Sequence, residues 1–372
     1  MKRFDALDSW RGIAACLVAL YHLRLYSDSH LVALPLLQHS YLFVDFFFVL
    51  SGFVIAANYE QRLAEGLSLW RFALLRFGRL YPLHLSLLAL CILLHLAHSA
   101  SDLSSVSAFQ PPFWSADTIV ANLLMVHSLH VFDFPTWNQP SWSISTEFYT
   151  YLLFGLALAA CKRRIGMLMI PVIVAATLAL WILVDDMDTT FDWGLVRCIL
   201  GFATGVLAWH ARRATRLRSG TALELATLGL VVAFVWLAGR TRFSLAAPAV
   251  FAPAVLVFAA EAGAASRLLR ARTFLWLGAH SYSIYLVHFV VAWLLLDAAK
   301  LASVGGIALY ADGKLGRGPW QGDLAYLLYF AFVLGVAAFT YRTIEFPARA
   351  WFRRLARAAP RKVARIEILQ PK

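Results

Sequence analysis

Arg11 and His22 are two polar side chains in the first apolar stretch of the chain, and the ten residues between them carry no charge. In an α-helix, eleven residues turn back to within about 20° of the starting direction and rise ~16 Å, so both side chains lie on one face at two depths. A guanidinium near one membrane surface and an imidazole near mid-bilayer would not anchor a helix well. Ionisable groups inside a membrane are costly and are usually functional. The spacing therefore indicates a pair of site residues.

A second pair of cations, Arg76 and Arg79, stands three residues apart at the start of another apolar stretch. Residues at this spacing are neighbours on one helical face. On charge rules alone they are ordinary basic flanks on the cytoplasmic side of a membrane helix. The second interpretation is a polyanion clamp formed with Arg11, because guanidinium groups bind phosphate through two hydrogen bonds at once. Three of them at one opening would suit a nucleotide diphosphate or a similar donor.

Further polar side chains fall within apolar stretches and could carry acid and base chemistry. Asp45 and Ser51 share one stretch. Ser143, Glu147 and Tyr151 follow one another at one-turn intervals in a second, which makes them one polar stripe. Serine and tyrosine also hold membrane helices together, so a packing role is the alternative for each hydroxyl. A carboxylate inside a membrane is harder to explain in that way, which makes Asp45 and Glu147 candidate catalytic groups.

A third set of polar residues, Ser281, Tyr285 and His288, recurs at i, i+4 and i+7 and forms another stripe. Several groups at similar depth favour a shared polar cavity. There an imidazole such as His22 could take a proton from a hydroxyl near neutral pH, and a neighbouring carboxylate would orient the ring. The sequence has no GxSxG elbow, HExxH motif or GxGxxG loop, and its four cysteines show no CxxC spacing, so no metal site or disulfide framework is indicated.

The composition indicates which kind of fold must position these groups. Of 372 residues, 61% are hydrophobic and only 15% are charged, which excludes a soluble globular domain of average composition. Apolar runs that approach the ~20 residues of a spanning helix recur from end to end and leave no room for a separate soluble domain. We therefore expect an all-α fold, a polytopic membrane helix bundle. The net charge of +12 falls in short clusters between apolar runs, so it indicates topology and contact with membrane lipids rather than a nucleic-acid partner.

The apolar runs predict about ten membrane-spanning helices. Their approximate ranges are 9–26, 41–58, 72–96, 142–161, 166–184, 193–210, 223–238, 245–260, 274–296 and 324–341. An eleventh run, 118–131, is too short to span comfortably and is better explained as a re-entrant or surface segment.

The distribution of Lys and Arg predicts the orientation of the chain. With a cytoplasmic N-terminus, 26 of the 33 Lys and Arg residues fall on the cytoplasmic side, six fall outside, and Arg197 lies within a span. This bias follows the positive-inside rule and places both termini in the cytoplasm. Residues 1–345 are expected to form one membrane-embedded domain. Residues 346–372 form a basic tail, which we expect to lie along the anionic cytoplasmic surface through Trp351 and Phe352.

Six short segments occur in order along the chain. They are LDSWRGIAA at 7–15 followed by His22, VDFFFVLSGF at 44–53, RxxRxxP at 76–82, PSWSISTEFY at 140–149, SYSIYLVH at 281–288 and IExP at 344–347. Together they resemble the ordered motifs of the acyltransferase 3 family, whose members are integral-membrane acyltransferases acting on bacterial surface carbohydrates. The resemblance covers nearly the whole chain, residues 7–349.

This resemblance implies transfer of an acyl group, commonly acetyl, from cytoplasmic acyl-coenzyme A to a sugar hydroxyl of a surface or exported glycan, such as a polysaccharide or lipopolysaccharide. It implies the bacterial inner (plasma) membrane, with acetyl-coenzyme A as the donor substrate and no permanently bound cofactor. The Arg-x10-His and RxxR motifs of the family match Arg11, His22, Arg76 and Arg79. Trp10 stands where a smaller aliphatic residue is usual. No hydrolase-like domain follows the last span, so the membrane unit is expected to act alone or with separate envelope glycan assembly partners.

The expected mechanism runs along the first helix. The three arginines hold the phosphates of the donor, and its pantetheine arm extends up the bundle toward His22, for which the ~16 Å rise is suitable. His22 then acts either as a general base on the acceptor hydroxyl or as a transient acyl carrier, with Asp45 or Glu147 as its partner. The other groups expected to contact substrate are Ser51, Ser143, Tyr151, Tyr285 and His288.

Two functions from other classes stay open. A glycan or lipid transporter also places polar groups within a many-span bundle, but its signature of Gly- or Pro-broken helices in related halves does not occur in this sequence. A non-catalytic scaffold of an envelope assembly complex would tolerate substitution at these polar positions. The outer loops expected to choose the acceptor are 27–40, 98–117 and 297–323.

Overall fold

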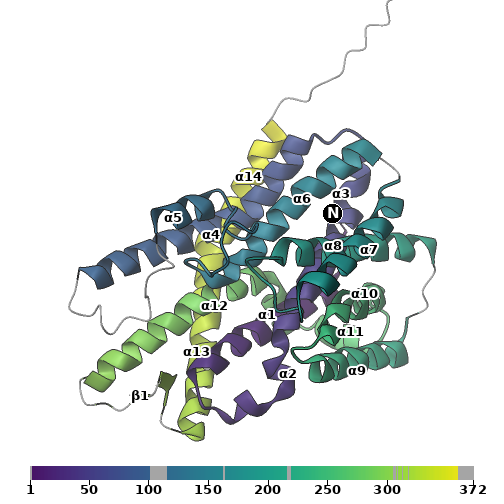
Figure 1. The fold of residues 1–372 in the computed structure, drawn as a ribbon. Coiled ribbons are helices and arrows are strands. Elements are labelled where there is room, and N and C mark those ends of the chain that lie inside the picture. The colour runs from purple at the N-terminus through teal and green to yellow at the C-terminus, as the bar shows by residue number, and fades with distance from the viewer. Residues whose placement is uncertain are drawn as a thin grey trace, which may run out of the picture.

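The computed structural model describes residues 2–100, 115–161, 164–215, 219–304, 307, 309–311, 313–316 and 318–358, so parts of the predicted outer loops 98–117 and 297–323 lie outside the described residues. Within the described part, the chain is a bundle of α-helices with one small hairpin, β1 (Tyr310–Ala311) and β2 (Lys314–Leu315) (Figure 1). The longer helices are α1 (Asp5–Leu23), α3 (Phe43–Ala64), α4 (Leu69–Ser99), α6 (Trp142–Cys161), α7 (Ile165–Leu183), α8 (Gly194–Ala214), α9 (Thr221–Ala238), α10 (Ala247–Phe258), α12 (Arg272–Val304), α13 (Pro319–Thr340) and α14 (Phe346–Ala358). The predicted all-α fold is confirmed.

Eight helical segments of the described chain are long and apolar enough to cross a membrane. They correspond to eight of the ten predicted spans, and the other two predicted spans are also helices. One of these, α1, carries Asp5, Asp8 and Arg11 in its first two turns, which leaves only a short apolar remainder. The other, α10, has 12 residues and reaches ~18 Å, less than the ~30 Å of a hydrocarbon core. By length and hydropathy, eight of the ten predicted spans are therefore candidates to cross a membrane, and α1 and α10 fall outside these criteria.

The apolar run at 118–131 forms the short helix α5 (Ala116–Leu123) and then leaves the helical conformation. The 8 residues of α5 extend only ~12 Å along the helix axis, so they do not cross a membrane. Met125 and His130 adopt left-handed backbone conformations, with φ of 56° and 62°. The Met125 carbonyl accepts a hydrogen bond from Ser145 Oγ at 2.6 Å, which ties this segment to α6. The prediction of a short segment that does not span is confirmed.

Close backbone contacts hold two central helix pairs, α1 with α12 and α3 with α8. A Cβ atom added at Gly12 would lie 2.5 Å from Gly278 N, and one added at Gly205 would lie 1.9 Å from Val49 O. Only glycine lets these backbones approach so closely, as is common where membrane helices cross. The two pairs form the frame that carries the polar side chains.

The last described helix, α14, packs against α4. α13 continues through a π-helical turn, Tyr341–Glu345, into α14. A Cβ atom added at Gly78 of α4 would come within 2.2 Å of Phe352 Cγ, so the ring is seated on the glycine. The predicted basic tail is therefore helical up to residue 358, and residues 359–372 lie outside the described residues.

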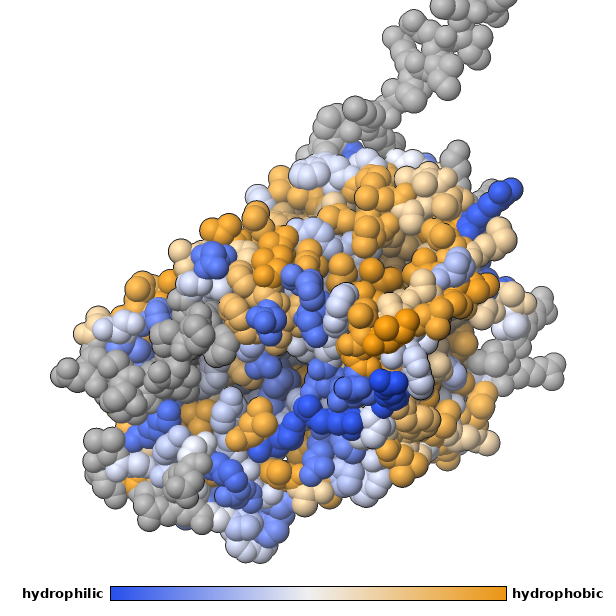
Figure 2. All heavy atoms as spheres, viewed as in Figure 1, coloured by the Kyte–Doolittle hydropathy of each residue, from blue (hydrophilic) through white to orange (hydrophobic). Residues whose placement is uncertain are grey.

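Large apolar side chains face outward on several helices. Ile182 of α7 is 76% exposed, and Leu237 of α9 is 72% exposed. In Figure 2, hydrophobic residues cover broad areas of the visible face, and a band of hydrophilic residues crosses its middle. An apolar exterior of this kind is what contact with lipid requires, and with the eight long apolar helices it defines a multi-pass membrane protein.

Candidate active site

A cavity of about 580 Å³ lies between α1, α3, α4, α6, α12 and α14. Eight of the eleven site residues predicted from the sequence line it. They are Arg11, Ser51, Arg76, Arg79, Ser143, Glu147, Tyr151 and Tyr285. The other three, His22, Asp45 and His288, do not line the cavity.

The cavity wall is strongly cationic. Its charged lining consists of seven cations and two carboxylates, a formal excess of five positive charges. The cations are Lys2, Arg3, Arg11, Arg76, Arg79, Arg349 and Arg353, and the carboxylates are Asp8 and Glu147. Charges of one sign along a cleft with low-dielectric walls raise the local concentration of oppositely charged ligands. The arrangement is therefore suited to a polyanion.

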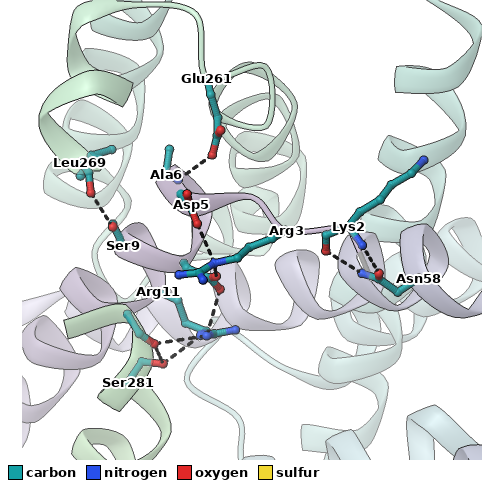
Figure 3. Close-up of polar contacts among 12 residues, drawn as sticks. Lys2, Arg3, Asp5, Ala6, Ser9, Arg11, Asn58, Glu261, Leu269 and Ser281 are labelled. Carbon is teal, nitrogen blue, oxygen red and sulfur yellow. Dashed lines mark hydrogen bonds and ion pairs between the residues drawn. The ribbon is translucent and has the colours of Figure 1, made fainter. Parts of the chain in front are cut away.

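Arg11 is fixed where α1 meets α12 (Figure 3). Its Nε donates to Ser281 Oγ at 2.8 Å, and its Nη2 donates to the Gly278 carbonyl oxygen at 3.2 Å. The same Nη2 lies 3.1 Å from Asp8 Oδ1, nearly one turn earlier on α1. These contacts hold the guanidinium in one position at the cavity wall.

Arg76 and Arg79 reach the cavity from α4. Arg76 Nη2 donates to Tyr59 OH at 2.7 Å, and its guanidinium lies over the Tyr59 ring at 4.8 Å from the centroid. Arg76 Nε is buried and has no partner in the described part of the chain. Arg79 lines the cavity and makes no hydrogen bond or ion pair with any residue that the structure describes. Both guanidinium groups therefore have donors left for a ligand.

Glu147 lies in a network of hydroxyl groups along the cavity. Ser51 Oγ donates to Glu147 Oε1 at 2.6 Å, and Tyr151 OH donates to the same oxygen. Ser51 Oγ and Tyr151 OH are 2.7 Å apart. One turn away on α6, Ser143 Oγ donates to Tyr285 OH at 2.8 Å. The two polar stripes predicted from the sequence therefore meet at this last bond.

His22 contacts His288 next to the Tyr285 side of the cavity. His22 Nδ1 lies 2.9 Å from the Val18 carbonyl oxygen and 3.2 Å from His288 Nε2. The centroids of the two imidazole rings are 4.8 Å apart, and the Tyr285 ring lies 5.9 Å from the His288 ring. Tyr285, which lines the cavity, and His288 thus connect the cavity to His22.

Asp45 forms a buried ion pair with Arg197. Arg197 Nε and Nη2 donate to the two carboxylate oxygens at 2.9 and 2.7 Å, and the side chains of Arg197 and Asp45 are 1% and 0% exposed. Arg197 also donates to the carbonyl oxygens of Thr189 and Tyr41 at 3.1 and 3.2 Å. The pair joins α3 to α8. Within the described residues no carboxylate hydrogen-bonds to His22, and the catalytic role of Asp45 stays a prediction.

Sequence reasoning misses two ion pairs, each with a buried carboxylate. Arg197 was expected only as a cation within a span, although a carboxylate in another span is the signal for such a pairing, because charges inside a membrane seek partners of opposite sign. Glu345 belongs to the IExP segment but receives no predicted role. In the structure, Ser283 Oγ donates to Glu345 Oε2 at 2.7 Å, and Arg349 forms an ion pair with Glu345.

The fold and site define a polytopic membrane protein with an internal cationic cavity and an adjoining pair of imidazoles. The model of the acyltransferase 3 family, described as an acyltransferase domain, matches residues 4–342, so the chain belongs to this family. It is therefore a membrane acyltransferase. The family and the enzyme class predicted from the ordered motifs are confirmed.

Two relatives are similar to part of the chain. "Protein 2 in picA locus" of Rhizobium radiobacter is 30% identical over 186 residues, which cover 46% of this chain and 93% of that protein. "Acyltransferase MdmB" of Streptomyces mycarofaciens is 33% identical over 165 residues, which cover 41% of this chain and 39% of that protein. No solved structure shows significant similarity to the chain. The family implies an acyl donor and an acceptor.

Proposed function

We propose that this acyltransferase transfers an acyl group, acetyl in particular, from acyl-coenzyme A to a sugar hydroxyl of a surface or exported glycan, and that it works in the bacterial inner membrane. The observation that carries the proposal is the cationic cavity with the histidine pair beside its Tyr285 wall. The family supplies the type of reaction, since an acyltransferase needs an acyl donor and an acceptor.

The donor end of the proposal rests on Arg11, Arg76 and Arg79. These guanidinium groups line one cavity from α1 and α4, and together they can bind a diphosphate through charge-assisted hydrogen bonds. Because Arg79 forms no hydrogen bond or ion pair with a described residue, no such bond must break there when an anion binds. In the orientation that the positive-inside bias predicts, the N-terminal segment and α14 at the cavity face the cytoplasm, where acyl-coenzyme A is found.

His22 is the proposed centre of the chemistry. A carbonyl oxygen only accepts hydrogen bonds, so we assign the proton to Nδ1, facing Val18, and the lone pair to Nε2. In one route, Nε2 takes the proton of the acceptor hydroxyl while that oxygen attacks the thioester carbonyl and the coenzyme A thiolate leaves. In the other, Nε2 attacks the carbonyl and the thiolate leaves; the acceptor oxygen then takes the acyl group from the imidazole, and the hydroxyl proton goes to the released thiolate.

The other predicted residues receive roles around this path. Glu147 is proposed to share protons with the reacting groups from the cavity side, where two hydroxyls fix its carboxylate. Asp45 is proposed to act through Arg197, by fixing the α3 helix that carries one cavity wall. The groups proposed to contact substrate are Ser51, Ser143, Tyr151, Tyr285 and His288.

The catalytic assignment is tested with purified protein in lipid nanodiscs. The release of coenzyme A from acetyl-coenzyme A and the labelling of a glycan acceptor are measured together. His22→Ala is expected to abolish acyl transfer while the protein stays folded, because the variant loses the proposed base or carrier. Full activity of a folded His22→Ala variant would exclude His22 from the chemistry. Trapping of a labelled acyl group on the wild-type chain would favour the carrier route over the general-base route.

The donor assignment is tested by Arg76→Ala. The expected result is a donor KM raised about 10-fold or more, because a hydrogen bond to a charged group contributes ~1.5–3 kcal/mol. Arg270→Ala is the matched control, because Arg270 is exposed and does not line the cavity. An unchanged donor KM in Arg76→Ala would leave this arginine with a topological role alone. Comparison of surface glycans from cells with and without the gene identifies the acyl group and the acceptor.

A further inference from the structure

Four cations that none of the motif assignments uses share the cavity with the three proposed donor arginines. They are Lys2, Arg3, Arg349 and Arg353. The first two precede α1 in the chain, and the other two belong to α14. The cavity therefore brings a second group of cations, from two further segments of the chain, close to the first.

The two N-terminal cations already have partners. Arg3 Nε lies 2.6 Å from Asp5 Oδ1 (Figure 3). Lys2 Nζ lies over the Trp209 ring at 4.4 Å from its centroid, and in Figure 3 its side chain extends away from Arg11. We therefore do not assign an additional ligand contact to Lys2 or Arg3.

The two cations of α14 have donors left. Arg349 forms an ion pair with Glu345, but its Nε is buried and has no hydrogen-bond partner in the described part of the chain. Arg353, four residues later on the same helical face, has no hydrogen bond or ion pair with any described residue. Both side chains therefore have donors available to an acceptor at this face of the cavity.

The packing of α14 sets the position of these two arginines. Phe352, adjacent to Arg353, is seated on Gly78, where a Cβ atom would lie 2.2 Å from its ring. Gly78 lies between Arg76 and Arg79 in α4. The contact therefore brings the arginines of α14 to the part of the cavity wall where the donor diphosphate is proposed to bind.

Coenzyme A carries two separated phosphate groups, a diphosphate next to the pantetheine arm and a monoester on the 3′ position of its ribose. A phosphomonoester holds close to two negative charges at neutral pH and three acceptor oxygens. We propose that Arg353 and the Arg349 Nε donor bind this 3′-phosphate, and that this subsite selects coenzyme A thioesters over thioesters whose carrier lacks the phosphate. The inference rests on the acyl-coenzyme A donor of the proposed function.

The test compares acetyl-coenzyme A with 3′-dephospho-acetyl-coenzyme A as donors for the full-length protein in nanodiscs. Wild-type protein is expected to use the complete donor with about 10- to 100-fold higher kcat/KM, the range for one or two charge-assisted contacts. Arg353→Ala is expected to lose activity with acetyl-coenzyme A only, so that the preference falls toward one. Arg354→Ala is the matched control, because Arg354 is exposed like Arg353 but does not line the cavity. It is expected to keep the wild-type preference.

A second variant tests the Arg349 donor, and a binding measurement tests the subsite without turnover. Arg349→Lys keeps a cation for Glu345 but removes the Nε donor, and it is expected to reduce the preference in part. Adenosine 3′,5′-bisphosphate is expected to bind wild-type protein about 10-fold or more tightly than 5′-AMP, and this difference is expected to be smaller in Arg353→Ala, which keeps only the Arg349 donor. Equal use of the two donors by wild-type protein, or an undiminished preference in Arg353→Ala, would overturn the subsite and leave the proposed function standing. Absence of turnover with either donor would overturn both.

Discussion

Asp45→Asn is expected to destabilise this protein strongly, because it removes one charge of a fully buried pair. The side chains of Asp45 and Arg197 are 0% and 1% exposed, and two hydrogen bonds of 2.9 and 2.7 Å join them. The amide would leave the buried guanidinium without the carboxylate that now accepts its two hydrogen bonds. Breaking a buried pair in this way costs about 3–5 kcal/mol, which corresponds to a fall in Tm on the order of 10 °C.

The assay is thermal unfolding of purified protein in one detergent, followed by tryptophan fluorescence. Asp185→Asn makes the same chemical change in an exposed pair, since Asp185 is 97% exposed and lies 3.2 Å from Arg242. It is expected to leave Tm unchanged, because water screens a pair of this kind. The double variant Asp45→Leu with Arg197→Met removes both charges, and it is expected to recover most of the stability that Asp45→Asn loses.

Equal melting of Asp45→Asn and Asp185→Asn would refute the reasoning from burial. Loss of acyl transfer by Asp45→Asn at an unchanged Tm would instead support the direct catalytic role for Asp45 that the sequence suggests. A low yield of folded Asp45→Asn together with a normal yield of the double variant would again show that an uncompensated buried charge causes the defect.

Three further outcomes are expected from other contacts. Gly205→Ala places a methyl group 1.9 Å from an α3 carbonyl oxygen and is expected to lower Tm. Gly229→Ala meets open space and is expected to leave Tm unchanged. Equal melting of the two variants would contradict the packing argument. Ser281→Ala removes the 2.8 Å hydrogen bond to Arg11 Nε. Steady-state assays are expected to show a higher donor KM with kcat retained. An unchanged donor KM would show that this hydrogen bond is dispensable. His288→Ala removes the ring in contact with the proposed catalytic imidazole and is expected to lower kcat about 10-fold or more, with donor binding by calorimetry unchanged; full turnover would exclude it from the path.

The helices and their polar faces could be predicted because both follow from local periodicity. Apolar runs fix where a helix can cross a membrane, and the 3.6-residue repeat fixes which side chains share a face. Ser143 and Tyr285 illustrate this, since each was placed on a polar stripe of its own helix and the two hydroxyls meet at 2.8 Å. The two predicted spans that fall outside the length and hydropathy criteria are α1, which has three charged residues in its first two turns, and α10, which is short.

The partners across the bundle could not be predicted in the same way. His22 and His288 are separated by 266 residues, and periodicity states which face of a helix is polar but not which helix lies opposite. The opposite helix is set here by backbone contacts such as Gly12 with Gly278, which leave no polar signature in the sequence. The contact of α14 with α4 is a further example, because the ring of Phe352 is seated on Gly78 and no polar pattern marks this pairing.

One pair of helices carries both ends of the proposed reaction path. α1 bears Arg11 and His22, and α12 bears Ser281 and His288, which contact them in the same order. Because helical rise is fixed at ~1.5 Å per residue, loop movements cannot change the separation of the two ends. Under the proposed function, α1 and α12 fix the distance between the site that binds the donor phosphates and the catalytic imidazole. A thioester on a carrier arm shorter or longer than pantetheine would place its carbonyl away from His22. The two helices therefore select donors by the length of the arm rather than by the identity of the acyl group.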